Sequence, residues 1–269
     1  MKQLIIFLIC CASVFGATNT WIGGTSTSWN LDANWSLTDV PESGDAVVIA
    51  ASANPPVVDA ATVVCDSISN TTTGVLTIPF SCAITCPSIY ANGTVSCIRI
   101  SGTADATIVG NITNASANTD DDTISFTSSG SLTVTGDVSG GSAGSTNTGI
   151  TVTHNDADVT INGNLYGGDG VASNNGLELA GTSSTVIVTG TVEGGTGAYS
   201  YGLAFVNAGA GVSDSATIGT VAIKPADTYP LGWITPATIS ISSFTVNGTA
   251  IGGTTTGSGR YDGGGRYNQ

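Results

Sequence analysis

The sequence predicts an all-β protein, a right-handed parallel β-helix solenoid of about seven coils with an N-terminal cap. Three observations support this prediction: a segment repeats along the chain, each repeat alternates apolar and polar residues, and few residues are charged. The repeats share a glycine, at spacings of 26, 27, 27 and 29 residues. These glycines are Gly110, Gly136, Gly163, Gly190 and Gly219. A period in the range of about 20–50 residues is typical of a repeat architecture.

Each repeat contains several short runs with a period of two residues. One run precedes each glycine, another follows it, and a further run lies upstream. The upstream runs are Ile98–Ile100, Ile124–Phe126, Ile150–Val152, Leu177–Leu179 and Leu203–Phe205. Such alternation places apolar side chains on one face of a strand and polar ones on the other. A single repeat cannot bury its apolar face alone, so we expect the coils to stack.

The same register extends toward the N-terminus. Pro87 lies 23 residues before Gly110, and Asp66 lies 21 residues before Pro87. The coils, assigned to residues 50–223, therefore begin short and lengthen. We expect Ser139–Gly149 and Gly167–Gly176 to form loops that project from one edge of the solenoid.

The composition excludes several kinds of partner. Of 269 residues only 9% are charged, and the net charge is −14. An ordinary globular domain has about 25% charged residues. An acidic surface repels nucleic acid and anionic lipid, so we expect neither as a partner, and no sequence motif indicates a cofactor.

Residues 1–16 are typical of a secretory signal peptide. Lys2 precedes the apolar core Leu4–Val14, and small residues surround the expected cleavage between Gly16 and Ala17. The apolar run is too short to span a bilayer. A lipoprotein anchor at Cys10 or Cys11 is the alternative, but neither cysteine follows the expected small residue. We expect a secreted, extracellular protein located at the cell surface.

Residues 17–49 contain three of the four tryptophans, Trp21, Trp29 and Trp35. An open solenoid end exposes strand edges and core side chains, so we expect these rings to form an N-terminal cap. A tryptophan-lined sugar platform is the alternative. The pattern W-x-G-G…W…N-W…P-x-x-G-D-x-V-x-I over residues 21–49 resembles the N-terminal segment of secreted bacterial parallel β-helix surface proteins, autotransporter passengers included. This resemblance implies an architecture and no catalytic residue.

Four cysteines follow the signal segment, Cys65, Cys82, Cys86 and Cys97. An even number in a secreted chain indicates disulfides, and four cysteines allow three pairings. Cys65 and Cys86 each precede a register position, so they should stack one coil apart. We therefore predict the pairs Cys65–Cys86 and Cys82–Cys97.

Candidate metal and catalytic residues are few. Asp156 and Asp158 are weak calcium candidates, because solvated turn residues would give the same pattern. A polysaccharide-degrading site would need clustered ionisable groups. However, Arg99 is the sole Lys or Arg between residues 17 and 223, and His154 is the sole histidine. We expect neither catalysis nor a bound metal.

Six asparagines lie in N-x-Ser/Thr sequons and are candidate glycosylation sites if the host modifies secreted proteins. They are Asn34, Asn70, Asn92, Asn111, Asn114 and Asn247.

Residues 224–252 predict further strands or a C-terminal cap, and residues 253–269 form a Gly/Arg/Tyr tail. Its Arg260, Tyr261, Arg266 and Tyr267 are either flexible or in contact with a neighbouring subunit. The leading hypothesis is a structural subunit that polymerises through its solenoid ends and this tail into a filament or layer. The alternatives are a monomeric adhesin that binds cell-surface glycans and, with least support, a polysaccharide-degrading enzyme.

Overall fold

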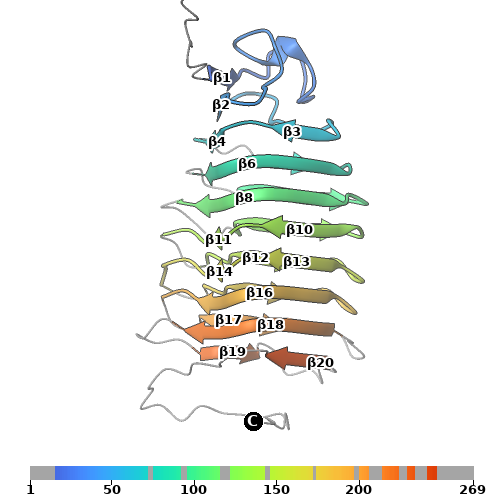
Figure 1. Cartoon of the computed structure of the whole chain (residues 1–269), viewed down its shortest axis with the longest axis vertical. Coiled ribbons are helices and arrows are strands. Elements are labelled where there is room, and N and C mark those ends of the chain that lie inside the picture. The colour runs from blue at the N-terminus through green and yellow to red at the C-terminus, as the bar shows by residue number, and fades with distance from the viewer. Residues whose placement is uncertain are drawn as a thin grey trace, which may run out of the picture.

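The computed structural model describes residues 16–71, 75–91, 96–115, 122–142, 146–171, 174–196, 200–205, 214–223, 229–233 and 241–246. These residues form a parallel β-solenoid whose coils stack along one axis (Figure 1). Within them the only helix is the single 3-10 turn η1 (Asp32–Asn34). No helix of the described part is long and apolar enough to cross a membrane. The predicted all-β solenoid is confirmed.

Two sheets build the solenoid, and the pairings between their strands are parallel. The 13-stranded sheet contains β1 (Thr18–Trp21), β2 (Ala46–Ile49), β3 (Thr62–Val64), β4 (Ser67–Asn70), β6 (Cys82–Ala91), β8 (Ala106–Asn114), β10 (Ser131–Thr135), β11 (Val138–Ser139), β13 (Asp158–Asn162), β14 (Leu165–Tyr166), β16 (Thr185–Gly194), β18 (Asp214–Ile223) and β20 (Ile241–Val246). The 7-stranded sheet contains β5 (Leu76–Ile78), β7 (Ile98–Gly102), β9 (Ile124–Ser128), β12 (Ile150–Val152), β15 (Leu177–Leu179), β17 (Tyr201–Phe205) and β19 (Tyr229–Trp233). The seven strands of this second sheet correspond to the predicted number of coils.

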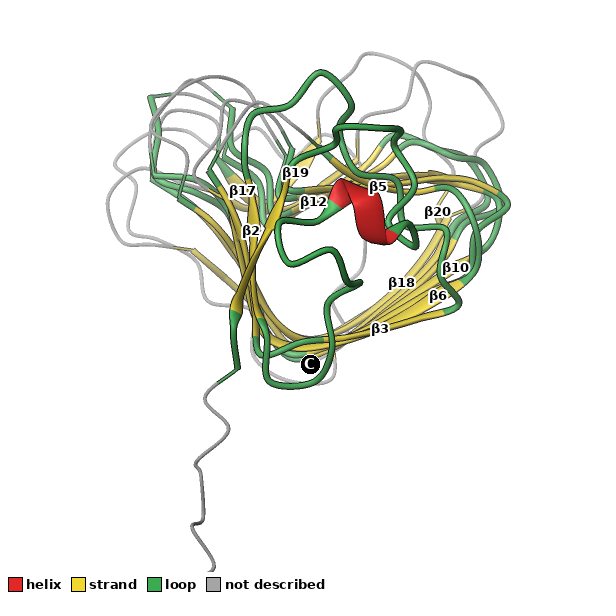
Figure 2. Cartoon of the chain, turned by 90° about the horizontal axis from the view of Figure 1, so that it is seen from above, coloured by secondary structure: helices red, strands yellow, loops and turns green. Residues whose placement is uncertain are grey.

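The larger sheet is bent, so the solenoid has three faces around one core (Figure 2). Face A1 comprises β3, β10, β13, β20 and the first halves of β6, β8, β16 and β18. Face A2 comprises β1, β2, β4, β11, β14 and the second halves of the same long strands. Face B is the seven-stranded sheet. The register shifts at the bend, between Thr85 and Ser88 in β6 and between Val188 and Thr191 in β16.

The repeated glycines lie at this bend and stack on one another, as their spacing predicts. A Cβ atom on Gly136 would lie 2.2 Å from the carbonyl oxygen of Gly110, and one on Gly163 would lie 2.1 Å from that of Gly136. Gly110 and Gly136 both have a φ of 143°, a conformation that side chains disfavour. Glycine therefore recurs because the corner has no room for a Cβ atom.

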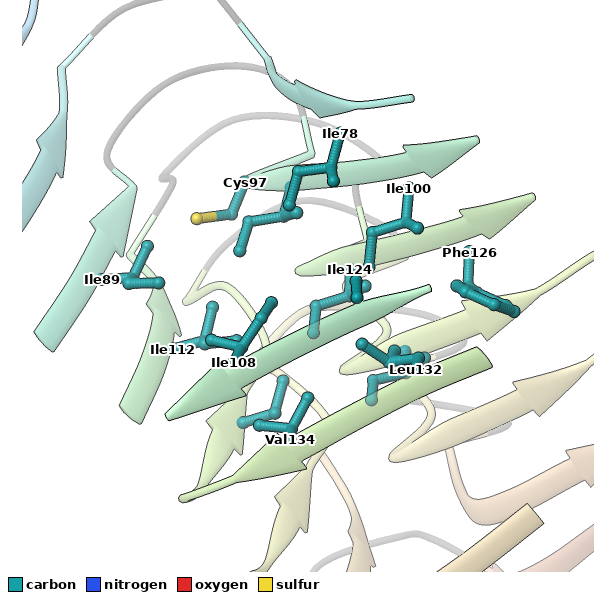
Figure 3. Close-up of a cluster of buried hydrophobic side chains, with 14 of the residues drawn as sticks. Ile78, Ile89, Cys97, Ile100, Ile108, Ile112, Ile124, Phe126, Leu132 and Val134 are labelled. Atoms are coloured by element: carbon teal, nitrogen blue, oxygen red, sulfur yellow. The ribbon is translucent and has the colours of Figure 1, made fainter. Parts of the chain in front are cut away.

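Inward-facing side chains form stacked columns of like residues. Along face A1, Ile84, Ile108, Val134, Ile161, Val188 and Ile218 are aligned by the strand register and at most 1% exposed. Figure 3 shows part of the core, where Ile108 and Val134 of face A1 lie with Ile100 and Ile124 of face B. Each coil thus buries the apolar side of its neighbours, which provides the main driving force for stacking.

Candidate functional surfaces

The N-terminal tryptophans are buried above the first coil. Trp21, Trp29 and Trp35 are each at most 1% exposed. The Trp35 ring lies edge-on to the other two, with centroid distances of 5.0 Å to Trp21 and 4.6 Å to Trp29. Its Nε1 donates a hydrogen bond of 2.7 Å to the Trp29 carbonyl. Rings enclosed in this way cannot stack on a sugar, so the geometry supports a cap rather than a platform.

The N-terminal cap that carries these tryptophans also covers part of the outer edge of β1. The backbone N–H of Ser36 donates to the Thr20 carbonyl at 2.8 Å, and the Thr20 N–H donates to Ser36 Oγ at 2.8 Å. Trp21 and Trp35 also form an antiparallel bridge. The first strand therefore has part of its edge closed by its own chain.

The other end of the solenoid differs. Within the described residues, β19 pairs with β17 alone and β20 pairs with β18 alone. Their far edges thus carry no strand from the described part of the chain. The proposed contact residues Arg260, Tyr261, Arg266 and Tyr267 lie outside the described residues.

Cys65 and Cys86 lie opposite each other in adjacent coils, as predicted from the register. The pairs Val64–Thr85 and Ser67–Ser88 fix this alignment. The hydrogen bond between the two sulfurs, and then burial, raise the pKa of Cys65, and the same hydrogen bond lowers the pKa of Cys86. All four cysteines are free thiols in the structure. The predicted Cys65–Cys86 disulfide is therefore not formed, although its sulfurs are adjacent.

The predicted Cys82–Cys97 pair is wrong for this register. Cys97 begins face B, because its carbonyl accepts the N–H of Leu76 at the start of β5. Cys82 follows the end of β5 and begins face A1, where it pairs with Ala106. The whole of β5, three residues or about 10 Å long, and the turn after it lie between the two positions, whereas a disulfide requires Cα atoms within about 7 Å. Burial raises the pKa of Cys82 to about 11 and that of Cys97 to about 12.

The acidic candidates lie in turns. Asp156 has a φ of 58°, and its backbone N–H donates to the Thr182 carbonyl at 2.7 Å. Asp158 begins β13 and is exposed. Among the described residues, no three His, Cys, Asp or Glu side chains lie close enough to hold a metal ion. Asp156 is thus an exposed turn residue and Asp158 an exposed strand residue, and calcium binding at either stays untested.

One acid was missed by the sequence interpretation. Glu178 lies on the outward side of face B, where alternation predicts an exposed carboxylate. Burial raises the pKa of Glu178, while a 3.0 Å hydrogen bond from Asn175 Nδ2 lowers it. Thr151, aligned with Glu178 on the neighbouring strand β12, is 8% exposed, and its hydroxyl has no hydrogen-bond partner among the described residues. One acid without a second acid or base does not form a glycoside-hydrolysing pair.

Three of the candidate glycosylation sites are wrong because their side chains are buried. Asn34, Asn70 and Asn114 are at most 2% exposed, and a glycan requires an accessible amide. Asn111 is exposed, and its Oδ1 accepts the N–H of Asp137 in the next coil at 2.9 Å. Asn92 and Asn247 lie outside the described residues.

No known protein family, curated protein or solved structure matches this chain. The resemblance over residues 21–49 therefore stays a prediction, and the solenoid of about seven coils is established by the structure itself.

Proposed function

We propose that the chain is a non-enzymatic extracellular structural protein, a subunit that assembles into a surface filament or layer. The observation that carries the proposal is the continuous seven-strand ladder of face B, with a matching ladder on the larger sheet. Such a rod has a repeated surface and two distinct ends, and contacts between unlike ends generate open filaments.

The distribution of ionisable groups supports a structural role. Arg99, the sole Lys or Arg of residues 17–223, lies on face B three strands from Glu178. At about 4.8 Å per strand the two backbones are roughly 14 Å apart. The acids named above lie in turns or alone. Hydrolysis of a glycosidic bond generally requires two carboxylates about 5–10 Å apart.

The two ends suggest how assembly would proceed. The cap closes part of the β1 edge, so simple pairing of a neighbour's strand with β1 is disfavoured. The contact would instead join the far edges of β19 and β20 to the outside of a neighbour's cap, with the tail that contains Arg260 and Arg266 as a second attachment. A basic tail on an acidic protein favours such docking.

The Cys65–Cys86 pair would stabilise the rod outside the cell. Disulfides persist in oxidising compartments, and the strand register already places these two cysteines opposite each other in adjacent coils. A bond there would join two of the shorter coils near the cap.

Glycan binding is the second candidate, because face A2 presents two tyrosines in one outward column. Tyr90 is 39% exposed, and the strand register aligns it through Thr113 and Ser139 with Tyr166. The rings are three strands apart, about 14 Å. Aromatic rings can stack on the apolar faces of sugars, so this column would suit an extended glycan.

Negative-stain electron microscopy of the secreted protein, with and without residues 253–269, tests the leading proposal. Filaments that disappear on truncation would support assembly through the tail, and filaments that persist would place the contact on the coil ends. Single rods in both samples, at concentrations up to those used for crystallisation, would overturn it. A glycan array with the wild-type protein and Tyr90→Ala would then test the second candidate.

A further inference from the structure

The outward side of face A1 carries two straight columns of small uncharged side chains. The first column is Thr62, Ala83, Thr107, Thr133, Thr160, Ile187 and Thr217, and the second is Val64, Thr85, Val109, Thr135 and Asn162. Threonine supplies more than half of these positions. The two columns contain no charged residue, although the chain has a net charge of −14.

The hydroxyl groups of this array are available to solvent. Among the hydrogen bonds of the described residues, those of Thr107, Thr133 and Thr160 have no protein partner. Between the threonines, Val109 is 42% exposed. The face therefore alternates free hydroxyls with exposed methyl groups.

Face A1 is also regular along the axis of the solenoid. Its strands superpose when viewed along the axis (Figure 2), and they form a flat stack from β6 to β18 in Figure 1. The loops Ser139–Gly149 and Gly167–Gly176 join face A2 to face B instead. Charged side chains lie outward on all three faces, with Glu193 on A2 and Glu178 on B. On face A1 the exposed Asp158 lies two residues before Thr160, outside the two columns.

A regular array of hydroxyls imposes a lattice on the water that it binds. The strands are spaced about 4.8 Å along the axis, and alternate residues lie about 6.6 Å apart along a strand. A hydroxyl holds a water molecule by hydrogen bonds, and neighbouring methyl groups limit where that water can lie. The resulting two spacings are close to the oxygen repeats on the prism planes of hexagonal ice.

We propose that face A1 binds the surface of ice crystals through this array, which we call the threonine array. The absence of charge from the two columns fits this ligand, because the ice lattice excludes ions. Adsorption of a rod along a growing crystal plane would stop growth between bound molecules. This activity does not depend on filament assembly.

Two other occupants fit the face less well. A second copy would cover a strip about 29 Å long and 10 Å wide, about 300 Å² per partner, whereas a stable interface buries about 800 Å² per partner. A crystalline polysaccharide would be expected to use aromatic rings, and neither column contains one.

The test measures ice growth with the purified secreted protein. Thermal hysteresis and inhibition of ice recrystallisation are expected for the wild-type chain. Thr133→Tyr places a bulky ring in the middle of the array and should abolish most of this activity, and Thr160→Val, which keeps the methyl group and removes the hydroxyl, should reduce it. Thr113→Tyr introduces the same ring on face A2 and should leave the activity unchanged. Circular dichroism melts establish that each variant is folded.

A folded wild-type protein without effect on ice would overturn the proposal, as would equal losses in Thr133→Tyr and Thr113→Tyr. Light scattering after size-exclusion chromatography tests whether a second copy of the chain occupies face A1. A dimer that Thr133→Tyr dissociates, without activity on ice, would assign the face to a second copy and would also overturn the proposal.

Discussion

The stacked corner glycines predict a large effect from a single added methyl group in Gly136→Ala. The Cβ atom would lie 2.2 Å from the carbonyl oxygen of Gly110 and 2.6 Å from its carbonyl carbon. Both atoms belong to the backbone of the preceding coil, so no side-chain rotation relieves the contact. The two coils must separate locally, which weakens the hydrogen bonds that join them there, from the Ile112 N–H to the Asp137 carbonyl and from the Asp137 N–H to Asn111 Oδ1.

The cost has two parts. A φ of 143° suits glycine, and placing an alanine in such a backbone conformation costs about 1–2 kcal/mol. Overpacking a tight contact adds about 1–3 kcal/mol. The free energy of unfolding should therefore fall by about 2–5 kcal/mol, which lowers the melting temperature of a chain of this size by roughly 4–20 °C.

Gly102→Ala is the matched control. Gly102 has a φ of 75°, but its added Cβ atom would approach the Pro79 carbonyl oxygen only to 3.3 Å. This variant should lose about 1–2 kcal/mol, the conformational part alone. Urea unfolding followed by circular dichroism and by tryptophan fluorescence measures both variants and detects unfolding in segments. If Gly136→Ala were no less stable than Gly102→Ala, coil contact at the corner would not limit the spacing, and the reasoning would be refuted.

Three further perturbations have defined outcomes. Trp35→Ala should lower the free energy of unfolding by about 3–5 kcal/mol in urea titrations, because it removes the central ring of the cap; a change below 1 kcal/mol would contradict the cap. If the Cys65–Cys86 disulfide forms outside the cell, alkylation of the secreted chain without reductant should leave both cysteines unmodified in mass spectrometry. The Cys65→Ser substitution should then make Cys86 available for alkylation. Glu178→Gln should raise the melting temperature near neutral pH and have little effect below about pH 4, because the raised pKa of Glu178 means that its folded form loses stability as pH rises; equal effects at both pH values would exclude this cause.

The sequence was sufficient to predict the solenoid and its register. From Gly110 onward, sterics at the corner exclude a Cβ atom, so Gly110 and the later glycines mark the coils directly. The period-2 runs then assign inward and outward residues, because stacked parallel strands keep one register along the whole ladder. The opposition of Cys65 and Cys86 followed from the same rule.

The errors arose where the sequence did not indicate on which face of the coil a residue lies or whether its side chain points inward. Cys82 and Cys97 were paired because they remained after the first pair, although they begin different faces. Asn114 ends a strand with its side chain inward, so its sequon is buried. Glu178 was expected to be exposed, but Asn175, in the loop before its strand, donates a hydrogen bond to it. Each error concerns the course of a loop or corner, which has no periodic signal.

The asymmetry of the two ends constrains any assembly. If the outermost strand edges were open at both ends of the solenoid, coils of neighbouring chains could continue one ladder. At the N-terminal end, however, the hydrogen bonds between Ser36 and β1 cover part of that edge. Contact between two C-terminal ends would be isologous and would stop at a dimer, whereas contact between a C-terminal end and a cap repeats without limit. A dimer that does not grow would therefore indicate joined C-terminal ends. A polymer would require that the outside of the tryptophan cap binds the last coil, and substitutions at exposed cap residues such as Leu37, 46% exposed, would then shorten it.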